Sequence, residues 1–224
     1  MKAIVYAMRK EVAAPFDGGT PIPDAAGLTL SRLSGGLLVC VCGIGKVNTA
    51  LAVQRLIDCY GVTEVWNAGV SGCFTDLPAG TLVAARSCVQ HDMDMFGDPL
   101  GTIPTLDLVH LPCAGPEDTL ARLTAAGYEC RPGVVATGDW FQRDFGRAAR
   151  IRDVFGATVC DMEAGAAAHV CLRNGVPFRS LKIVSDHLFH PSQYEEYQAN
   201  LPAAVKRLNE ALAALLTGSG KEPS

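Results

Sequence analysis

ATVCDMEAGAAAHVCLRNGVPFRSLKIVSD, residues 157–186, is the stretch of sequence that decides the fold. Two mainly apolar runs, Ala157–Asp161 and Val176–Asp186, flank Ala164–Asn174, whose many small residues allow a helix to pack closely. Short apolar runs on either side of a helical segment are typical of strands in an α/β sheet. The stretch therefore predicts a strand, a helix and a second strand.

Each of the two predicted strands leads to a carboxylate, Glu163 after the first and Asp186 at the end of the second. Open α/β sheets place their ligand crevices at the carboxyl ends of strands. An acid at such a position costs stability unless a partner or a ligand compensates its charge. These two side chains are therefore candidates for a functional site.

Further strands and helices are predicted on both sides of this unit. Strands are expected at Met1–Met8, Leu28–Leu33, Leu37–Cys42, Glu64–Gly69, Thr81–Gln90 and Gly133–Gly138. Helices are expected at Asn48–Tyr60, Glu117–Ala126, Phe145–Phe155 and Tyr194–Leu216, with a long loop at 97–117 and a frayed tail at 217–224. The chain has no repeat, linker or break in composition, so residues 1–224 predict a single α/β domain with a mixed β-sheet flanked by helices.

Composition excludes several classes of protein. Hydrophobic residues make up 49% of the 224 residues and the net charge is -4, which leaves no basic field to attract nucleic acid. The longest apolar runs are too short to span a membrane. The nine cysteines are an odd number without a CxxC pair, which predicts reduced thiols and a cytoplasmic protein.

The glycine-rich run Gly43-Ile44-Gly45-Lys46 almost matches a phosphate-binding loop. A Walker loop requires Gly where Cys40 stands and Ser or Thr where Val47 stands, and the dinucleotide fingerprint fails because Asn48 occupies its third glycine position. What remains is a turn between a strand and a helix, which can still bring backbone close to a ligand.

A second near match is Gly69-Val70-Ser71-Gly72-Cys73, in which Cys73 replaces the last glycine of a nucleophile elbow. We interpret this run as a tight turn after a strand, whose backbone groups face a ligand. Ser71 is therefore a poor candidate nucleophile.

Two histidine motifs suggest a metal site but do not complete one. His91-Asp92-Met93-Asp94 follows a predicted strand, whereas such His-Asp clusters bind metals in helical folds, so Asp92 and Asp94 are expected to hold loops by hydrogen bonds. His187-x-x-His190 has no further Cys or His at ligand spacing. We therefore predict no metal and no cofactor.

Six motifs occur together in an order that resembles the purine nucleoside phosphorylase and nucleosidase superfamily, and most of all its 5'-methylthioadenosine/S-adenosylhomocysteine nucleosidases. The similarity begins at Ala7–Val12 and extends to the closing helix. The motifs are Gly43–Val47, Asn67–Gly72, His91–Asp94, Thr137–Asp139, Asp161–Ala164 and Val184–Asp186. The resemblance implies the nucleoside phosphorylase/hydrolase-like fold and cleavage of the N-glycosidic bond of a purine nucleoside.

This chemistry needs an acid on the departing base, an activated water on the other face of the sugar and anchors for the sugar hydroxyls. By resemblance, Asp186 protonates the purine, Glu11 activates the water and Glu163 accepts the ribose hydroxyls. The residues alone leave a structural alternative for each. Glu11 could be a solvated charge near a helix start, Glu163 a helix cap and Asp186 a turn cap.

The resemblance also implies the walls of the pocket. Phe141 stacks on the purine, the backbone of Gln142 contacts its edge and Met162 packs on the ribose. Met8, Ile44 and Tyr194 surround the 5' substituent, although Met8 and Ile44 could equally be core residues. The substrate-binding set is completed by Val70, Ser71, Gly72, Lys182 and Ser185.

The chain departs from the family at several positions. Lys182 replaces the usual Arg near the water site and lacks its bidentate fork. The loop 94–97 is about two residues shorter than usual, Trp140 is bulkier than expected, and Leu188 and Phe189 replace small or polar residues. These differences leave the fold prediction intact and the choice of substrate open.

We predict a cofactor-free, homodimeric, cytoplasmic hydrolase of 5'-modified purine nucleosides, with 5'-methylthioadenosine or S-adenosylhomocysteine as the leading substrate. A futalosine-type nucleoside is the nearest alternative. Phosphorolysis is a second alternative, which Glu11 disfavours because a carboxylate repels phosphate. A non-catalytic nucleoside-binding protein on the same fold is the third.

Overall fold

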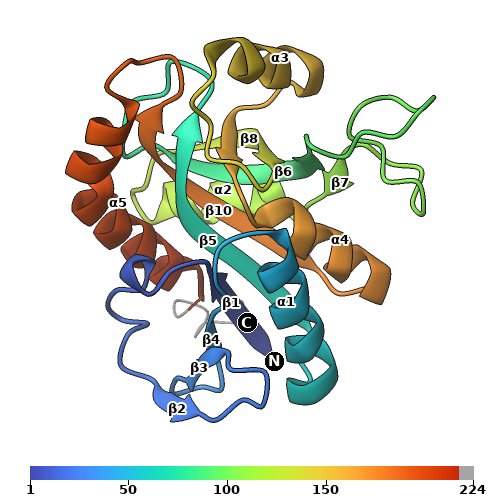
Figure 1. Cartoon of the computed structure of the whole chain (residues 1–224). Coiled ribbons are helices and arrows are strands. Elements are labelled where there is room, and N and C mark those ends of the chain that lie inside the picture. The colour runs from blue at the N-terminus through green and yellow to red at the C-terminus, as the bar shows by residue number, and fades with distance from the viewer. Residues whose placement is uncertain (217–224) are drawn as a thin grey trace.

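The structure is a computed structural model that describes residues 1–216, so the predicted frayed tail at 217–224 lies outside the described residues. A ten-stranded mixed β-sheet forms its centre and helices cover the sheet (Figure 1). The strands are β1 Lys2–Tyr6, β2 Thr20–Ile22, β3 Thr29–Arg32, β4 Leu38–Val41, β5 Glu64–Cys73, β6 Leu82–Gln90, β7 Leu111–Pro112, β8 Cys130–Thr137, β9 Val159–Asp161 and β10 Phe178–His187. The predicted α/β class is confirmed.

The sheet closes on itself at one end. Its strand order is β10-β6-β8-β9-β5-β1-β4-β3-β2, and β10 pairs with β5 as well as with β6. β5, β10, β6, β8 and β9 therefore form a closed ring, while β1 to β4 extend from β5 as an open sheet. β1 and β10 both run parallel to β5, so their carboxyl ends meet at one edge.

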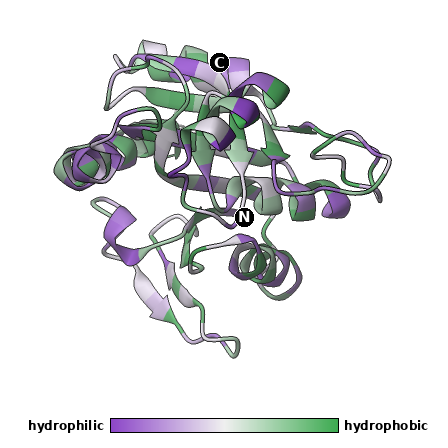
Figure 2. Cartoon of the chain, turned by 45° about the horizontal axis from the view of Figure 1, so that its top comes forward, coloured by the Kyte–Doolittle hydropathy of each residue, from purple (hydrophilic) through white to green (hydrophobic). Residues whose placement is uncertain are grey.

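Helices lie on opposite sides of the central strands. α1 (Lys46–Tyr60) packs against α4 (Ala164–Asn174) on one side, and α5 (Gln193–Leu216) packs on β10 and β5 on the other (Figure 1). α2 (Pro116–Ala125) lies beside α5, and α3 (Phe145–Phe155) lies near β8. The strands are mostly hydrophobic, whereas the helices carry hydrophilic and hydrophobic residues side by side (Figure 2). None of the described helices has the length and apolar character required to cross a membrane.

The small residues of α4 allow it to approach the sheet closely. A Cβ on Gly165 would lie 2.9 Å from Cβ of Thr137 on β8 and 3.1 Å from Cγ of Gln90 on β6. Gly165 N–H donates to Thr137 Oγ1 at 2.8 Å, so the contact also satisfies a backbone donor at the start of the helix. The predicted close packing of this helix is confirmed.

The sequence-based bounds hold best where helical periodicity is strong. α3 and α4 match their predictions to the residue, and α1 begins two residues before its predicted start. The chain also contains a short 3-10 helix, η1 (Arg9–Glu11), and two short strands that the sequence did not predict. These strands, β2 and β7, lie inside the turn-rich segment 18–27 and the long loop 97–117, where Gly and Pro hide the alternation of a strand.

The prediction of a tight turn at Gly69–Cys73 is wrong, because β5 continues to Cys73. This part of the strand is paired with β10 on one side and, at Gly72 and Cys73, with β9 on the other. Its glycines do not form a turn. They leave room for side chains of other elements to approach the strand. A Cβ on Gly69 would lie 2.9 Å from Oε1 of Glu11, and one on Gly72 would lie 2.8 Å from Cδ2 of Leu188.

Gly165→Ala should test the close approach of α4. A helical Gly→Ala change contributes up to about 1 kcal/mol of stability, whereas forcing a methyl into a packed contact costs about 1–3 kcal/mol. Because the new Cβ would lie within 3.0 Å of Thr137, we expect a net loss of about 1–2 kcal/mol in the free energy of unfolding. Urea denaturation measures it, with Gly18→Ala, which has open space around it, as a control near zero.

Candidate active site

The carboxyl ends of β1, β5, β9 and β10 surround one cavity of about 300 Å³, the size of a small-molecule site. Thirteen of the fourteen site residues predicted from the sequence line it. They are Met8, Glu11, Ile44, Val70, Ser71, Gly72, Phe141, Gln142, Met162, Glu163, Ser185, Asp186 and Tyr194. Residues from both ends of the chain therefore meet at this edge of the sheet.

Glu11 ends η1, the short helix that follows β1, and its carboxylate is buried. Its Oε2 accepts a hydrogen bond from Met8 N–H at 2.9 Å, and its Oε1 accepts one from Val70 N–H at 3.2 Å. The side chain is not a solvated charge, as the structural alternative required, because Glu11 is only 2% exposed. Burial raises the pKa of Glu11, while the nearby Lys182 ammonium and these two donors oppose the shift.

Glu163 precedes α4 but does not cap it with its side chain. The first helical donors go elsewhere, because Ala164 N–H donates to Asp161 Oδ2 at 2.8 Å and Gly165 N–H to Thr137 Oγ1. The Glu163 carboxylate is free to line the cavity, where its Oε1 accepts Gly45 N–H at 2.9 Å. Burial, followed by the negative charge of Asp161, raises the pKa of Glu163 to about 7.

Asp186 lies within β10, next to a shift in the register of β10 against β5, and is not a turn cap. Such irregularities re-aim side chains next to active sites. Its Oδ1 accepts the Ser185 hydroxyl at 2.6 Å and its Oδ2 accepts the Gln193 amide at 2.8 Å. Burial raises the pKa of Asp186, and these two hydrogen bonds oppose the shift.

Lys182 is the predicted site residue that does not line the cavity, which corrects its expected role as a substrate contact. Its side chain is 1% exposed, and its Nζ lies 2.7 Å from Oδ2 of Asp161. Burial disfavours the ammonium, but the carboxylates of Asp161, Glu163 and Glu11 outweigh it and raise the pKa of Lys182. Lys182 therefore supplies buried positive charge behind a group of acids.

Sequence reasoning missed several residues of this site. Asp161, Gln193, Tyr197, Lys10 and Cys160 line the cavity but were not predicted to do so. A signal existed for Tyr197, because Gln193, Tyr194 and Tyr197 share one side of a helix at spacings of three and four residues. Asp161 ends a strand two residues before Glu163, but only the fold reveals that it pairs with Lys182.

Three aromatic side chains line one part of the cavity. Phe141 meets Tyr197 edge-to-face with ring centroids 6.4 Å apart, and Tyr194 stacks on Tyr197 at 6.1 Å. Phe141 and Tyr194 are both partly exposed to solvent, so their rings remain accessible to a ligand. Lys10 lies over the Tyr197 ring with its Nζ 5.1 Å from the centroid.

The bulky departures from the family pattern have structural roles next to this wall. Arg147 of α3 stacks over the Trp140 ring. Leu188 is buried in the apolar cluster beneath α3, and Phe189 packs against the same cluster. Leu188 and Phe189 therefore pack α3 against the segment that follows β10.

The other sequence motifs have structural roles. Gly45 N–H and Lys46 N–H, at the start of α1, donate to the carboxylates of Glu163 and Asp139, so the protein's own acids occupy these donors. Asp92 accepts from Lys46 Nζ at 2.7 Å and from Asp139 N–H at 3.1 Å, which confirms its predicted role in holding loops. The Ser71 hydroxyl donates to the Ile183 carbonyl.

The fold and this cavity are those of a protein that binds a small molecule, and the buried carboxyl groups of the cavity are suited to acid–base chemistry. The family model described as the phosphorylase superfamily matches residues 9–217, and the chain belongs to this family. Relatives named as nucleosidases confirm the predicted class of enzyme, an N-glycosyl hydrolase.

Similar proteins carry two kinds of name. The 5'-methylthioadenosine/S-adenosylhomocysteine nucleosidase of Geobacillus kaustophilus is 33% identical over 96% of both chains. The aminodeoxyfutalosine nucleosidase of Campylobacter jejuni is 33% identical over 68% of both. The crystal structure of 5'-methylthioadenosine/S-adenosylhomocysteine nucleosidase from Helicobacter pylori with butyl-thio-DADMe-Immucillin-A has a TM-score of 0.89 at 26% identity, and the match covers 97% of both chains.

Glu163→Gln should change how stability depends on pH. Because the pKa of Glu163 is raised from 4.5 to about 7, the folded protein retains this proton over that interval while the unfolded chain loses it. This carboxyl therefore contributes stability below about pH 4.5 that is lost as pH rises to about 7.

The glutamine variant removes this loss. The difference in free energy of unfolding between this variant and the wild type should increase by about 3 kcal/mol as the pH rises from 4.5 to 7. Urea denaturation across this pH range measures the difference, and the exposed Glu195→Gln provides a control with a nearly constant difference. A flat difference for Glu163→Gln would contradict the raised pKa.

Proposed function

We propose that the protein hydrolyses the N-glycosidic bond of a 5'-modified purine nucleoside, with 5'-methylthioadenosine or S-adenosylhomocysteine as the leading substrate. The observation that carries the proposal is the arrangement of Glu11, Glu163 and Asp186 as three buried carboxyl groups on one cavity. Each has different hydrogen-bond partners, so the three groups can take different roles in one reaction.

Asp186 acts as the general acid toward the purine. Its raised pKa favours a protonated carboxyl, which can transfer its proton to N7 of the departing base. The Ser185 and Gln193 hydrogen bonds fix the orientation of the carboxyl. Phe141, which borders the cavity with an accessible face, stacks on the purine ring, and the Gln142 backbone contacts its edge.

Glu11 activates the attacking water and Glu163 binds the ribose hydroxyls. Backbone donors hold Glu11 from two sides, so its carboxylate is fixed in place for a proton transfer. The negative charge of Glu163 stabilises the cationic sugar that forms as the bond breaks. Met162 packs on the ribose, and Met8, Ile44 and Tyr194 surround the 5' substituent.

Hydrolysis is favoured over phosphorolysis by the charges around the cavity. The described residues that line it include three carboxylates besides Asp186 and no arginine. Phosphate sites in proteins use arginine forks or free donors at a helix start. At the start of α1 both Gly45 N–H and Lys46 N–H already donate to carboxylates. A phosphate ion would meet the Lys10 ammonium but no arginine among the described lining residues, and the surrounding carboxylates would repel it.

A futalosine-type nucleoside is the second candidate substrate. Relatives at comparable identity are named for aminodeoxyfutalosine or for methylthioadenosine, and both kinds of substrate carry a 5' group. The fold alone is also compatible with a non-catalytic binding protein, but three retained acids in one cavity favour an enzyme.

Release of the free base from a panel of nucleosides tests the proposal. 5'-Methylthioadenosine, S-adenosylhomocysteine, aminodeoxyfutalosine, adenosine and inosine are incubated with the protein, with and without phosphate. We expect phosphate-independent release, fastest for a 5'-modified adenine nucleoside. Release that requires phosphate would overturn hydrolysis, and no release from any nucleoside would favour the binding protein.

The same assay assigns the acid. Asp186→Asn should lower kcat by about 10²–10⁴-fold, because the amide keeps the shape and cannot donate the proton. Asp153→Asn, an exposed change on α3, is the matched control and should retain activity. Near-normal turnover of Asp186→Asn would remove Asp186 as the acid.

We also infer a cytoplasmic homodimer that uses α1 and the segment after β6. Val47 and Leu51 on α1, and Met95 and Phe96 on that segment, expose apolar side chains without a covering element among residues 1–216. The segment that carries Met95 and Phe96 projects from the body of the molecule (green in Figure 1). Exposed apolar groups of this kind mark protein interfaces.

Light scattering after size-exclusion chromatography tests the dimer. The wild type should elute with twice the mass of the 23.6 kDa chain. Leu51→Asp and Phe96→Asp should shift it toward the monomer, because a charge buried at the interface lacks a partner. Val154→Asp, at an exposed apolar position on α3, should leave it dimeric. A wild-type monomer at micromolar concentration would contradict the inference.

A further inference from the structure

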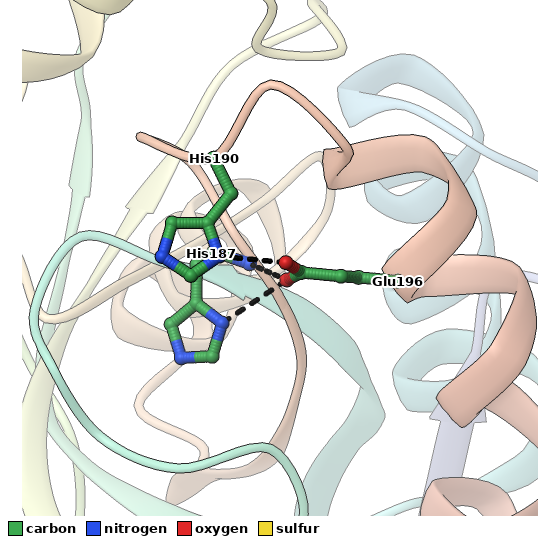
Figure 3. A group of neighbouring side chains, drawn as sticks. All are labelled: His187, His190 and Glu196. Carbon is green, nitrogen blue, oxygen red and sulfur yellow. Dashed lines mark hydrogen bonds and ion pairs between the residues drawn. The ribbon is translucent and has the colours of Figure 1, made fainter.

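The segment between β10 and α5 brings together three side chains that the proposed reaction does not use. His187 ends β10, His190 lies in the connecting turn, and Glu196 points back at both from the first turn of α5 (Figure 3). Glu196 Oε2 lies 3.1 Å from Nδ1 of His187, and its Oε1 lies 2.6 Å from Nδ1 of His190. One ligand atom from each residue lies within 4.8 Å of the others.

The second ring nitrogen of His187 determines what can lie between these groups. Its Nε2 is 2.9 Å from the carbonyl oxygen of Leu77, so Nε2 carries a proton and donates it. In a neutral imidazole the Nδ1 then holds a lone pair, which faces a carboxylate oxygen of Glu196. Two lone pairs at this distance need a cation between them, either a proton or a metal ion.

The Leu77 contact also favours the metal ion. Histidines that bind metals usually donate their other ring N–H to a backbone carbonyl or a carboxylate, which fixes the tautomer and the ring. His187 makes this outer bond to Leu77, whose side chain packs against the hydrophobic core. Two imidazoles and one carboxylate form a donor set suited to Zn²⁺ and related ions.

We propose that His187, His190 and Glu196 bind a divalent transition-metal ion of the Zn²⁺ class, with water in the remaining position. Metal–nitrogen distances of about 2.0–2.1 Å place tetrahedral ligand atoms about 3.3 Å apart. The His187–Glu196 pair is close to this spacing. The His190 side chain is 54% exposed and can turn slightly to reach it.

The sequence hid this site because its third ligand is on another element. His187-x-x-His190 has no further Cys or His at ligand spacing, and Glu196 becomes a neighbour only when the first turn of α5 folds back. None of the three residues lines the substrate cavity. The metal site therefore does not depend on the proposed hydrolysis.

A metal ion here would stabilise the segment that completes the cavity. Gln193, which donates to Asp186 at 2.8 Å, and Tyr194, which lines the cavity, both lie between His190 and Glu196. Joining the two ends of this segment through one ion limits its motion. The ion has a positioning role and takes no part in the proton transfers.

Metal binding to the full-length protein tests the proposal directly. The protein is reduced, freed of metal with a chelator, and titrated with Co²⁺ by visible absorbance and with Zn²⁺ by equilibrium dialysis. We expect one ion per chain in the micromolar range or tighter, with a cobalt spectrum that lacks thiolate charge-transfer bands. His190→Ala should weaken binding by roughly tenfold or more.

Two matched variants control for other ligands. His110→Ala removes another exposed histidine, and Cys59→Ser removes an exposed thiol. Both should bind the metal as the wild type does, and the same concentration of Zn²⁺ should raise Tm more in them than in His190→Ala. Equal affinity of His190→Ala and wild type would overturn the site. So would the absence of stoichiometric binding, which would mean that protons alone bridge these side chains.

Discussion

The buried ammonium of Lys182 is the interaction on which the rest of the site depends. Three carboxylates, Asp161, Glu163 and Glu11, act on it, and it touches Asp161 at 2.7 Å. Without this charge the carboxylates would repel one another in a buried environment. Removing one partner of a buried ion pair such as Lys182–Asp161 costs about 3–5 kcal/mol. The sheet makes the arrangement possible because β9 and β10 deliver Asp161 and Lys182 from different parts of the ring.

The pairing also separates the tasks of the acids. Asp161 uses its oxygens on Lys182, Thr137 and the first donor of α4, so it does not compete for a ligand. Glu163 is thereby released from capping the helix and borders the cavity. Asp186 accepts hydrogen bonds from Ser185 and Gln193, which are both neutral. Neither partner stabilises its ionised form with a positive charge. Lys182 thus opposes the rise in pKa that burial causes at Glu11 and Glu163, whereas Asp186 has no such cation among its hydrogen-bond partners.

Much of the fold and the membership of the cavity could be predicted from the sequence, but the pairings could not. Strand–carboxylate patterns locate Glu163 and Asp186, and the order of motifs connects them to Glu11. The same patterns misplace Lys182, because periodicity does not reveal whether a strand residue faces the cavity or lies behind it. They also misinterpret Gly69–Cys73 as a turn, because glycine marks both a turn and a place where side chains from other elements approach a strand closely.

α5 explains why residues from the two ends of the chain can act together. Three of its amides reach the site elements, since Gln193 donates to Asp186, Asn200 to the Ser185 carbonyl and Asn209 to the Glu11 carbonyl. Asn209 also accepts the Tyr6 hydroxyl at 2.7 Å, which fixes β1 to the same helix. A single helix therefore sets the position of the acid relative to that of the base. Periodicity identifies this helix from its apolar face, yet its contribution to the site lies in polar residues that the same pattern assigns to solvent.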